Sequence, residues 1–240
     1  MSRRRPLHRA LALGAMAAAV SGCLPETATS QGQRVADLYT VFMIAAAGVF
    51  VLVIGLLAWT VVRYRGQPGR SVEMPPQTPG SLRLEAVWWL LPTILVGVLA
   101  FLTIDVLGDV DARADEPGLV VEVAGYQWGW QFTYPDSGVV VNGTAADPPR
   151  VRLPVGETVA FVISSRDVIH SFNIPTFLIK RDAVPGQENR FDVVIEMEGT
   201  YGGQCGEFCG LLHARQLFEI EGVSPEAFDA WLAEQAGSER

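Results

Sequence analysis

The fold is decided first by residues 40–62, which read TVFMIAAAGVFVLVIGLLAWTVV and carry no charged side chain. At about 1.5 Å per residue, a helix of this length crosses a hydrocarbon layer of about 30 Å. Trp59 and Tyr64 lie near its far end, where aromatic side chains favour the membrane interface. We therefore predict a first transmembrane helix over residues 40–62.

A second apolar run covers residues 86–104 and predicts a second transmembrane helix over residues 86–107, with Pro92 in its early turns, where a missing amide costs little. The linker at 63–85 is rich in proline and glycine, which interrupt regular structure. Its charged residues up to position 83 are Arg63, Arg65, Arg70, Arg83 and the single acid Glu73. Because arginine-rich loops stay in the cytoplasm, we predict a two-helix transmembrane hairpin with residues 23–39 and 108–240 outside.

The first 22 residues predict a bacterial signal peptide, with an arginine-rich start and an apolar run over residues 10–20. The sequence Val20-Ser21-Gly22-Cys23 resembles a lipobox, which predicts cleavage before Cys23 and lipidation of its thiol. An ordinary signal peptide with an incidental cysteine is the alternative. Residues 24–34 are polar and lack a pattern, so we expect a flexible lead-in within residues 23–39.

The charge of the chain favours a cationic partner. Its formal net charge is -8, and from Val106 onward there are 21 acidic residues and 9 basic ones. Such a surface repels nucleic acid and suits a basic protein. The alternative is that the acidity only keeps the external domain soluble.

From Asp109 to Gly222 the sequence changes to short β-branched and aromatic runs separated by turn residues. We predict strands at 119–123, 130–134, 151–153, 158–164, 170–174, 190–195 and 216–221, with turns at 135–138, 142–143, 154–156 and 185–186. This spacing favours an antiparallel Greek-key sandwich or small barrel. Ser224 and Pro225 then predict a short C-terminal helix, with Phe228, Trp231 and Leu232 on its packed face.

Soft and imidazole ligands are concentrated in one place. Beyond Cys23 the chain has two cysteines and two histidines, and three of the four lie in CGEFCGLLHARQ, residues 205–216. The fourth is His170. Cys205, Cys209 and His213 follow one another at four-residue steps, which favours a metal site.

Several interpretations of these four residues stay open. A disulfide is favoured in an exported domain, but it leaves His213 without a role. Structural zinc also fits two thiolates and two imidazoles, although such sites usually have two residues between the cysteines. Copper suits a mixed set, because thiolates stabilise cuprous ion and imidazoles suit cupric ion. A type 1 copper leaves one thiolate idle, whereas two coppers bridged by both thiolates use all four residues.

Taken together, the motifs resemble one family over nearly everything from Thr40 onward. The chain is similar to subunit II of haem-copper cytochrome c oxidases, the carrier of the dinuclear copper A centre. The resemblance implies a cupredoxin-like external domain. It rests on EAVWWLLP at 85–92, YQWGW at 126–130, DVIHSF at 167–172, KRDAVPG at 180–186 and the loop at 205–213.

The resemblance implies a role for each matching residue. His170 and His213 would be terminal copper ligands, Cys205 and Cys209 the bridges, and the backbone carbonyl of Glu207 a weak ligand. The Glu207 side chain would also face a magnesium or manganese ion shared with subunit I. Trp128 matches the aromatic that receives the electron, with a core tryptophan as the alternative. Glu85 matches the acid at the mouth of a proton path, with an unrelated interfacial glutamate as the alternative.

One position departs from the family pattern. The family places a methionine three residues after the last histidine, as a weak copper ligand, and this chain has Gln216. An amide oxygen is harder than a thioether, so it should favour cupric ion and lower the reduction potential. We expect a binuclear site that still assembles, with a degenerate site as the alternative.

The expected function follows from the resemblance. The chain would accept electrons from cytochrome c and pass them to haem in subunit I, where oxygen reduction is coupled to proton translocation, while it makes and breaks no substrate bond itself. It would lie in the bacterial plasma membrane with other oxidase subunits. The runner-up is a membrane-tethered copper carrier or sensor. A quinol oxidase subunit fits poorly, because members of that branch typically lack the copper ligands.

Overall fold

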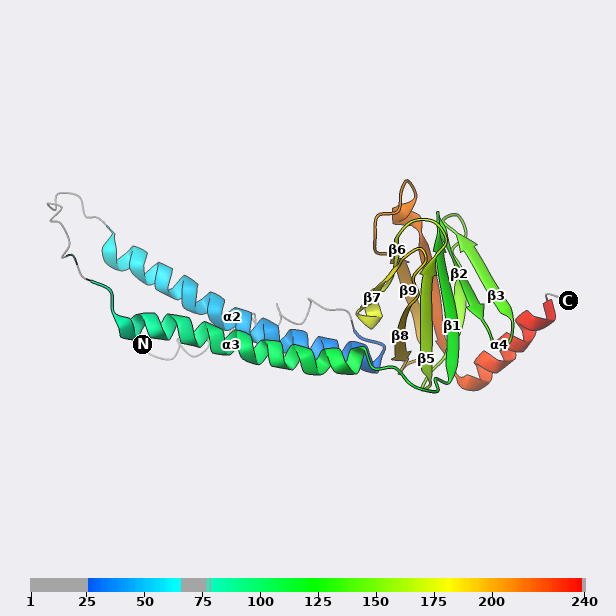
Figure 1. Ribbon diagram of the computed structural model, residues 1–240, viewed down its shortest axis with the longest axis horizontal. Helices are drawn as coiled ribbons and strands as arrows, with labels where there is room; N and C mark the ends of the chain where they lie inside the picture. The colour runs from blue at the N-terminus through cyan, green and yellow to red at the C-terminus, as the bar shows by residue number, and fades with distance from the viewer. Residues whose placement is uncertain (1–25, 66–76, 78, 239–240) are drawn as a thin grey trace, which may run out of the picture. The chain divides into compact units, whose positions relative to one another are not determined.

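The computed structural model describes residues 26–65, 77 and 79–238. The chain divides into two compact units (Figure 1). One covers Asp37–Val106, and the other combines the described residues up to Ala36 with those from Leu107 onward. Residues 1–22 and Cys23 lie outside the described residues, so the signal peptide and the lipidation site stay predictions.

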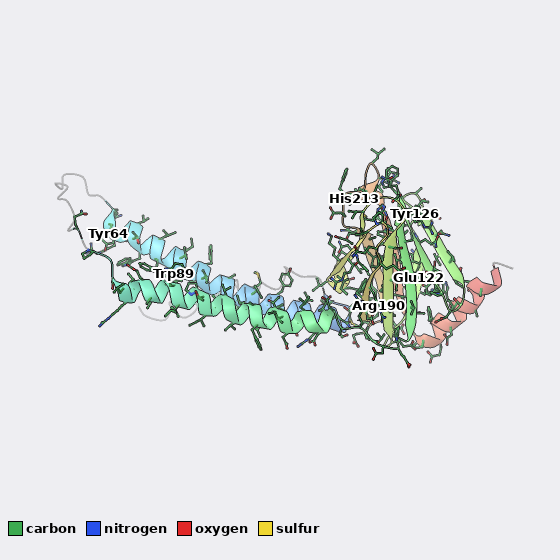
Figure 2. The ribbon with its side chains drawn as sticks, viewed as in Figure 1. Tyr64, Trp89, Glu122, Tyr126, Arg190 and His213 are labelled. Carbon is green, nitrogen blue, oxygen red and sulfur yellow. The ribbon has the colours of Figure 1, made fainter. Side chains whose placement is uncertain are left out.

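The first unit consists of long apolar helices. Helix α2 spans Ser30–Tyr64 and α3 spans Leu82–Val110, and both are long and apolar enough to cross a membrane. They contain the predicted spans and extend beyond them. Figure 2 shows Trp89 projecting from α3, where its side chain is exposed. The hydroxyl groups of Thr60 and Thr93 donate to carbonyls one turn earlier, which satisfies these polar groups within each helix.

Two five-stranded sheets face each other in the second unit, with the strand orders β3-β2-β1-β5-β8 and β4-β10-β9-β6-β7. The strands are β1 (Leu119–Tyr126), β2 (Gly129–Tyr134), β3 (Val139–Thr144), β4 (Arg150–Pro154), β5 (Thr158–Ser165), β6 (His170–Ile174), β7 (Ile179–Ala183), β8 (Asn189–Val194), β9 (Gly199–Cys205) and β10 (Leu217–Val223). The predicted sandwich is therefore confirmed. Its purely antiparallel character is wrong, because β1 pairs with β5 and β10 pairs with β4 in parallel.

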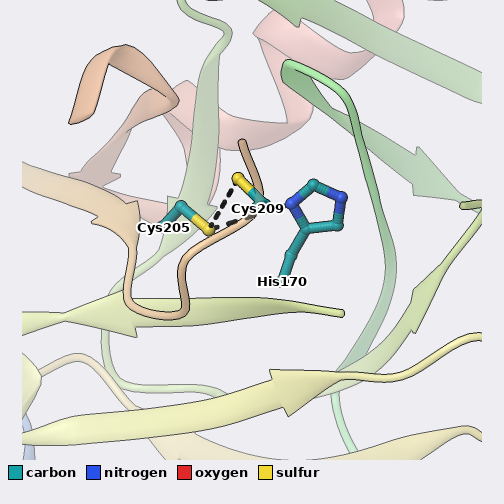
Figure 3. Close-up of side chains that lie close together, drawn as sticks. All are labelled: His170, Cys205 and Cys209. Carbon is teal, nitrogen blue, oxygen red and sulfur yellow. Dashed lines mark hydrogen bonds between the residues drawn. The ribbon is translucent and has the colours of Figure 1, made fainter. Parts of the chain in front are cut away.

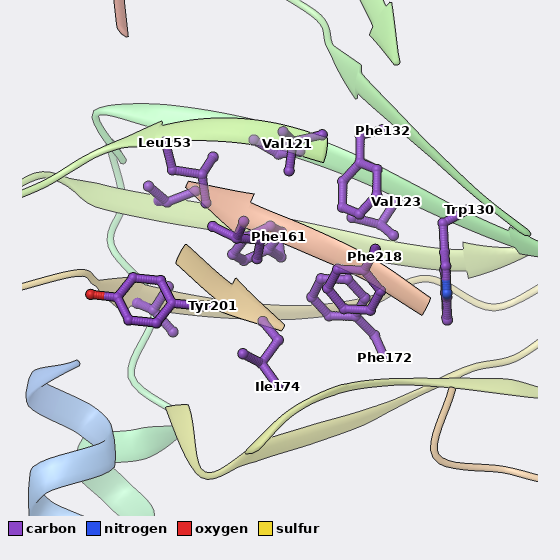
Figure 4. Packing of buried hydrophobic residues seen from close by; sticks show 14 of the residues in the cluster. Val121, Val123, Trp130, Phe132, Leu153, Phe161, Phe172, Ile174, Tyr201 and Phe218 are labelled. Carbon is purple, nitrogen blue, oxygen red and sulfur yellow. The ribbon is translucent and has the colours of Figure 1, made fainter. Parts of the chain in front are cut away.

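Aromatic side chains fill the space between the sheets (Figure 4). Phe172 of β6 stacks on Phe218 of β10, with ring centroids 4.5 Å apart. Trp130 packs edge-on against both rings and is fully buried. Each such side chain stabilises the fold by about 1.5–3 kcal/mol through burial alone. The aromatic cluster thus supports β6, the strand on which His170 lies.

All seven predicted strands are present, and their ends lie within two residues of the predicted ends, except that β1 continues to Tyr126. Three further strands were not predicted. These are β3, β7 and β9, which contain asparagine, glycine or charged residues that lower β propensity. Asn142 and Gly143 do not form the predicted turn, because they pair with Gln131 and Trp130 inside β3. Tertiary pairing overrides the local turn signal here.

The expectation of a flexible lead-in is wrong for its described part. Ala28 and Thr29 are buried, and Thr29 forms a β-bridge with Ile195. The Thr29 hydroxyl accepts from the amide of Gly32 at 3.0 Å, as at a helix N-cap. Gly32 is required here, because a Cβ would lie 2.8 Å from the carbonyl oxygen of Phe177. The first turn of α2 is therefore packed on the β-domain, the unit that contains both sheets.

The C-terminal helix α4 (Pro225–Ser238) forms as predicted. The Ser224 hydroxyl accepts from the Ala227 amide at 3.3 Å, which confirms the predicted cap. Trp231 meets Tyr134 of β2 edge-on at 5.5 Å, and Phe228 packs beside it. The helix thus covers one end of the sandwich core.

Candidate metal centre

Strand pairing brings the two parts of the ligand set together. His170 opens β6 and Cys205 closes β9, and these strands pair with Phe172 opposite Cys205. The loop after Cys205 continues into a single 3-10 turn at His213–Arg215. The Cys205 amide donates to the Gln216 carbonyl at 2.9 Å, which closes the loop at its base.

Three buried side chains, those of His170, Cys205 and Cys209, lie close together at this loop, with the half-exposed His213 beside them. Figure 3 shows the two thiols beside the ring of His170. The Sγ atoms of Cys205 and Cys209 lie 3.8 Å apart. His170 Nδ1 lies 3.8 Å from the first thiol, and His213 Nδ1 lies 3.7 Å from the second. Each thiol therefore lies near the Nδ1 atom of one histidine.

The alternative of a disulfide between Cys205 and Cys209 is not found in the described residues. Both cysteines are free, and a bond would need the sulfurs at about 2.05 Å. His170, Cys205 and Cys209 form a group whose donor atoms lie within 4.8 Å of one another, and all three residues are buried. That arrangement is suited to a cation.

Gln216 is fully buried and its amide has a fixed orientation. Its nitrogen donates to the carbonyls of Gly129 at 2.9 Å and Tyr126 at 3.3 Å. The amide oxygen therefore points to the opposite side, where it lies 3.1 Å from both His170 Nδ1 and Cys209 Sγ. An oxygen donor thus lies among the sulfur and nitrogen donors.

Acidity differs between the two thiols because their neighbours differ. Burial alone would raise the pKa of Cys205, but hydrogen bonds from His170 and the backbone at Glu207 lower that pKa to about 6. Burial and the charge of Cys205 raise the pKa of Cys209 to about 12. Burial would lower the pKa of His170, whereas hydrogen bonds with Cys205 and Asp167 raise it. The surroundings of Cys205 therefore favour its thiolate in the metal-free site, where a cation can replace the proton.

Trp128 lies against the second cysteine. Its indole nitrogen donates to the Cys209 carbonyl at 3.3 Å, and the side-chain amide of Gln127 donates to the same oxygen at 2.7 Å. Gly210 has a φ of 122° and approaches the Trp128 ring so closely that a Cβ would lie 3.1 Å away. The half-exposed indole is therefore in direct contact with the metal-binding loop.

Glu207 divides its polar groups between the interior and the surface. Its carbonyl oxygen lies 3.2 Å from Cys205 Sγ, and its carboxylate pairs with Lys180 at 3.3 Å. Glu85 belongs to the other unit, in the first turn of α3. Within the unit that contains both sheets, the structure thus brings six of the predicted site residues together with Trp128.

The donor set fits two ions better than one. Each thiol has one nitrogen and one oxygen donor nearby. Cys205 Sγ lies 3.8 Å from His170 Nδ1 and 3.2 Å from the Glu207 carbonyl. Cys209 Sγ lies 3.7 Å from His213 Nδ1 and 3.1 Å from the Gln216 oxygen. With both sulfurs shared, these side chains and carbonyls would offer each of two ions donors of mixed softness, which would suit copper.

Two features escaped the sequence interpretation. Asp167 Oδ1 lies 2.9 Å from His170 Nε2, and the carbonyls of Tyr126 and Gly129 orient the Gln216 amide. The acid could have been suspected from its position three residues before a candidate ligand. No side chain marks the carbonyl contacts, because backbone acceptors are the same at every residue.

Comparisons with known proteins agree with this geometry. A family model described as cytochrome c oxidase subunit II, transmembrane domain, matches residues 17–106, and one described as its periplasmic domain matches residues 119–223. A probable cytochrome c oxidase subunit 2 from Streptomyces coelicolor is 35% identical over 98% of this chain and 89% of its own.

Two further similarities were found. Cytochrome c oxidase subunit 2 from Thermostichus vulcanus is 30% identical over 88% of this chain and 77% of its own. Among solved structures, the periplasmic domain of cytochrome oxidase subunit II from Bradyrhizobium japonicum is similar, with a TM-score of 0.49 and 27% identity. That similarity covers 52% of this chain and 99% of the other.

Proposed function

Because the chain belongs to the cytochrome c oxidase subunit II family, we propose that His170, Cys205, Cys209 and His213 hold its pair of copper ions. The observation that carries the assignment is the pair of free thiols 3.8 Å apart, each facing a histidine Nδ1. The Glu207 carbonyl and the Gln216 amide oxygen would complete the two donor sets.

The protein is the electron-transfer subunit of a haem-copper oxidase. It is a two-span membrane protein with its C-terminal domain outside the cytoplasm, and it works in a complex with other oxidase subunits. When bound, the copper pair supplies a one-electron redox centre. The chain holds its ligands on paired strands and a hydrogen-bonded loop, which keeps reorganisation small. Family membership therefore does not favour the copper carrier or sensor.

Trp128 is proposed to receive the electron from cytochrome c. Its indole contacts the Cys209 carbonyl and remains half-exposed, so it connects the surface to a ligand residue. The acidic domain would attract a basic cytochrome, and raised salt is expected to slow that encounter.

Three finer assignments depend on the family resemblance. The Glu207 carboxylate would face a magnesium or manganese ion shared with subunit I, and its half-exposed pairing with Lys180 leaves it available for exchange. Glu85 would lie at the mouth of the proton path. Haem in subunit I would receive the electron.

Copper content and paramagnetic spectra of the full chain test the proposal. The detergent-solubilised protein, loaded with cuprous and cupric ion, should bind two coppers and give a delocalised mixed-valence signal. Cys209→Ser should lose that signal, whereas Ser137→Ala, in the turn at the opposite end of β2, should retain it. One zinc per chain without visible absorbance would contradict the proposal.

A further inference from the structure

The carboxylate of Asp167 lies between a metal ligand and the turn that carries Trp128. Its Oδ1 lies 2.9 Å from His170 Nε2, and its Oδ2 accepts from the backbone amide of Gln127 at 2.7 Å. Oδ1 also accepts from the amide of Val168 at 2.6 Å. Both carboxylate oxygens therefore have hydrogen-bonding partners, although 32% of the side chain is exposed.

The contact with His170 has a definite chemical consequence. Two backbone amides, of Gln127 and Val168, donate to its two oxygens, so the Asp167 carboxylate serves as an acceptor on both sides. An ionised carboxylate only accepts hydrogen bonds, so Nε2 must carry the proton. The free electron pair of the ring is then on Nδ1, the nitrogen that faces Cys205 and the Gln216 oxygen.

The second oxygen acts on a different part of the molecule. Gln127 and Trp128 form the turn between β1 and β2, and this turn is also bound to the Cys209 carbonyl through both of their side chains. Asp167 therefore ties the backbone of the turn to His170, while the side chains tie it to the cysteine. The turn is therefore hydrogen-bonded to Asp167, which contacts His170, and to the carbonyl of Cys209.

We propose that Asp167 is a positioning residue for electron transfer, fixing the ring of His170 with one oxygen and the turn of Trp128 with the other. The inference rests on the proposed function. Its charge also strengthens His170 as a donor, because an anionic acceptor on Nε2 raises electron density at Nδ1. Oxidised copper gains more from such a donor, so Asp167 lowers the reduction potential.

Asp167→Asn is the main test, in the copper-loaded full chain. It should shift the redox equilibrium toward the reduced form by roughly tenfold, about 59 mV for one electron. The histidine nitrogen couplings in pulsed paramagnetic spectra should change, and electron uptake from reduced cytochrome c should slow roughly tenfold. Asp167→Glu should restore part of the potential and of the coupling pattern, because it returns the carboxylate.

Asp136→Asn is the matched control, since it removes the same charge from an exposed turn at the opposite end of β2. It should leave all three readouts unchanged. In the metal-free chain, nitrogen NMR of His170 should show the proton on Nε2 in the wild type and a changed tautomer balance in Asp167→Asn. Circular dichroism separates these effects from misfolding, and if Asp167→Asn does not fold, Asp167→Glu carries the same readouts.

The outcomes separate this inference from the function on which it rests. A wild-type chain that binds two coppers, beside an Asp167→Asn variant indistinguishable from Asp136→Asn, overturns the role of Asp167 alone. A wild-type chain that never binds two coppers overturns the proposed function and this inference together.

Discussion

His170 and His213 present the same nitrogen to the two thiols, but the fold holds them differently. His170 begins strand β6, is fully buried, and has a hydrogen-bonding neighbour at each ring nitrogen. His213 lies in a three-residue 3-10 turn, is half-exposed, and meets the ring of Phe208, which is 79% exposed. Figure 2 shows His213 in the loop above the strand ends.

This contrast indicates a division of work within the site. The strand half, which is His170 on β6, obtains its geometry from sheet pairing and the aromatic core. The loop half depends on local bonds, such as the His213 amide donating to the Gly210 carbonyl at 3.2 Å. We therefore expect the strand half to be sensitive to core mutations and the loop half to depend on the metal.

Removing the support beneath His170 should have the largest effect. Trp130 is fully buried and its ring centroid lies 6.0 Å from that of His170. Trp130→Ala should lower the free energy of unfolding by about 3–5 kcal/mol, because it leaves a cavity in the core. Phe208→Ala should change it by less than about 0.5 kcal/mol. Thermal unfolding followed by near-ultraviolet circular dichroism measures both, and equal losses would contradict the division.

Metal removal should destabilise the loop half, which is the segment at 206–213 that carries Cys209 and His213. At copper concentrations of 100 times the dissociation constant, binding stabilises the folded state by about 2.7 kcal/mol. Chelation should therefore lower the melting temperature and increase hydrogen exchange of the amides at 206–213. The amides of β6 should keep most of their protection. Equal loss of protection in both segments would show that the strand half is not formed in advance.

Replacing Gln216, which contacts His170, with methionine should have a smaller effect on the free energy of unfolding than Trp130→Ala. Gln216→Met removes the donor to the Gly129 and Tyr126 carbonyls and should cost about 1–3 kcal/mol of unfolding free energy. A thioether favours cuprous ion, so the reduction potential should rise. A redox titration with thermal unfolding checks both. An unchanged potential would mean that the Gln216 oxygen is not a ligand.

The smallest effect concerns protonation of the metal-free thiols. Because the pKa of Cys205 is lowered to about 6, one thiolate should be present at neutral pH and disappear as the pH falls through about 6. The pKa of Cys209 is raised to about 12, so the second thiol should stay protonated across this range. Ultraviolet thiolate absorbance follows the step, which Cys205→Ser should abolish. A step that remains in that variant would assign it to another group.

Residue type and spacing were enough for much of this protein. The uncharged run at 40–62 predicted a helix in apolar surroundings. Short β-branched and aromatic runs predicted β5 and β6 near their observed bounds. The four-residue steps from Cys205 to His213, with a lone His170, predicted a metal site from residue type and spacing alone. These signals are local, because residue type and spacing can be recognised within a short stretch of the sequence.

Other features depended on contacts between distant segments. Asn142 and Gly143 joined β3 because Gln131 and Trp130 pair with them, and Thr29 joined the β-domain through Ile195. The orientation of Gln216 and the attachment of Asp167 to both His170 and Gln127 follow from backbone groups brought together by folding. A hydrogen bond between residues many positions apart leaves no periodic trace in a sequence, so these arrangements exist only once the sheets have closed.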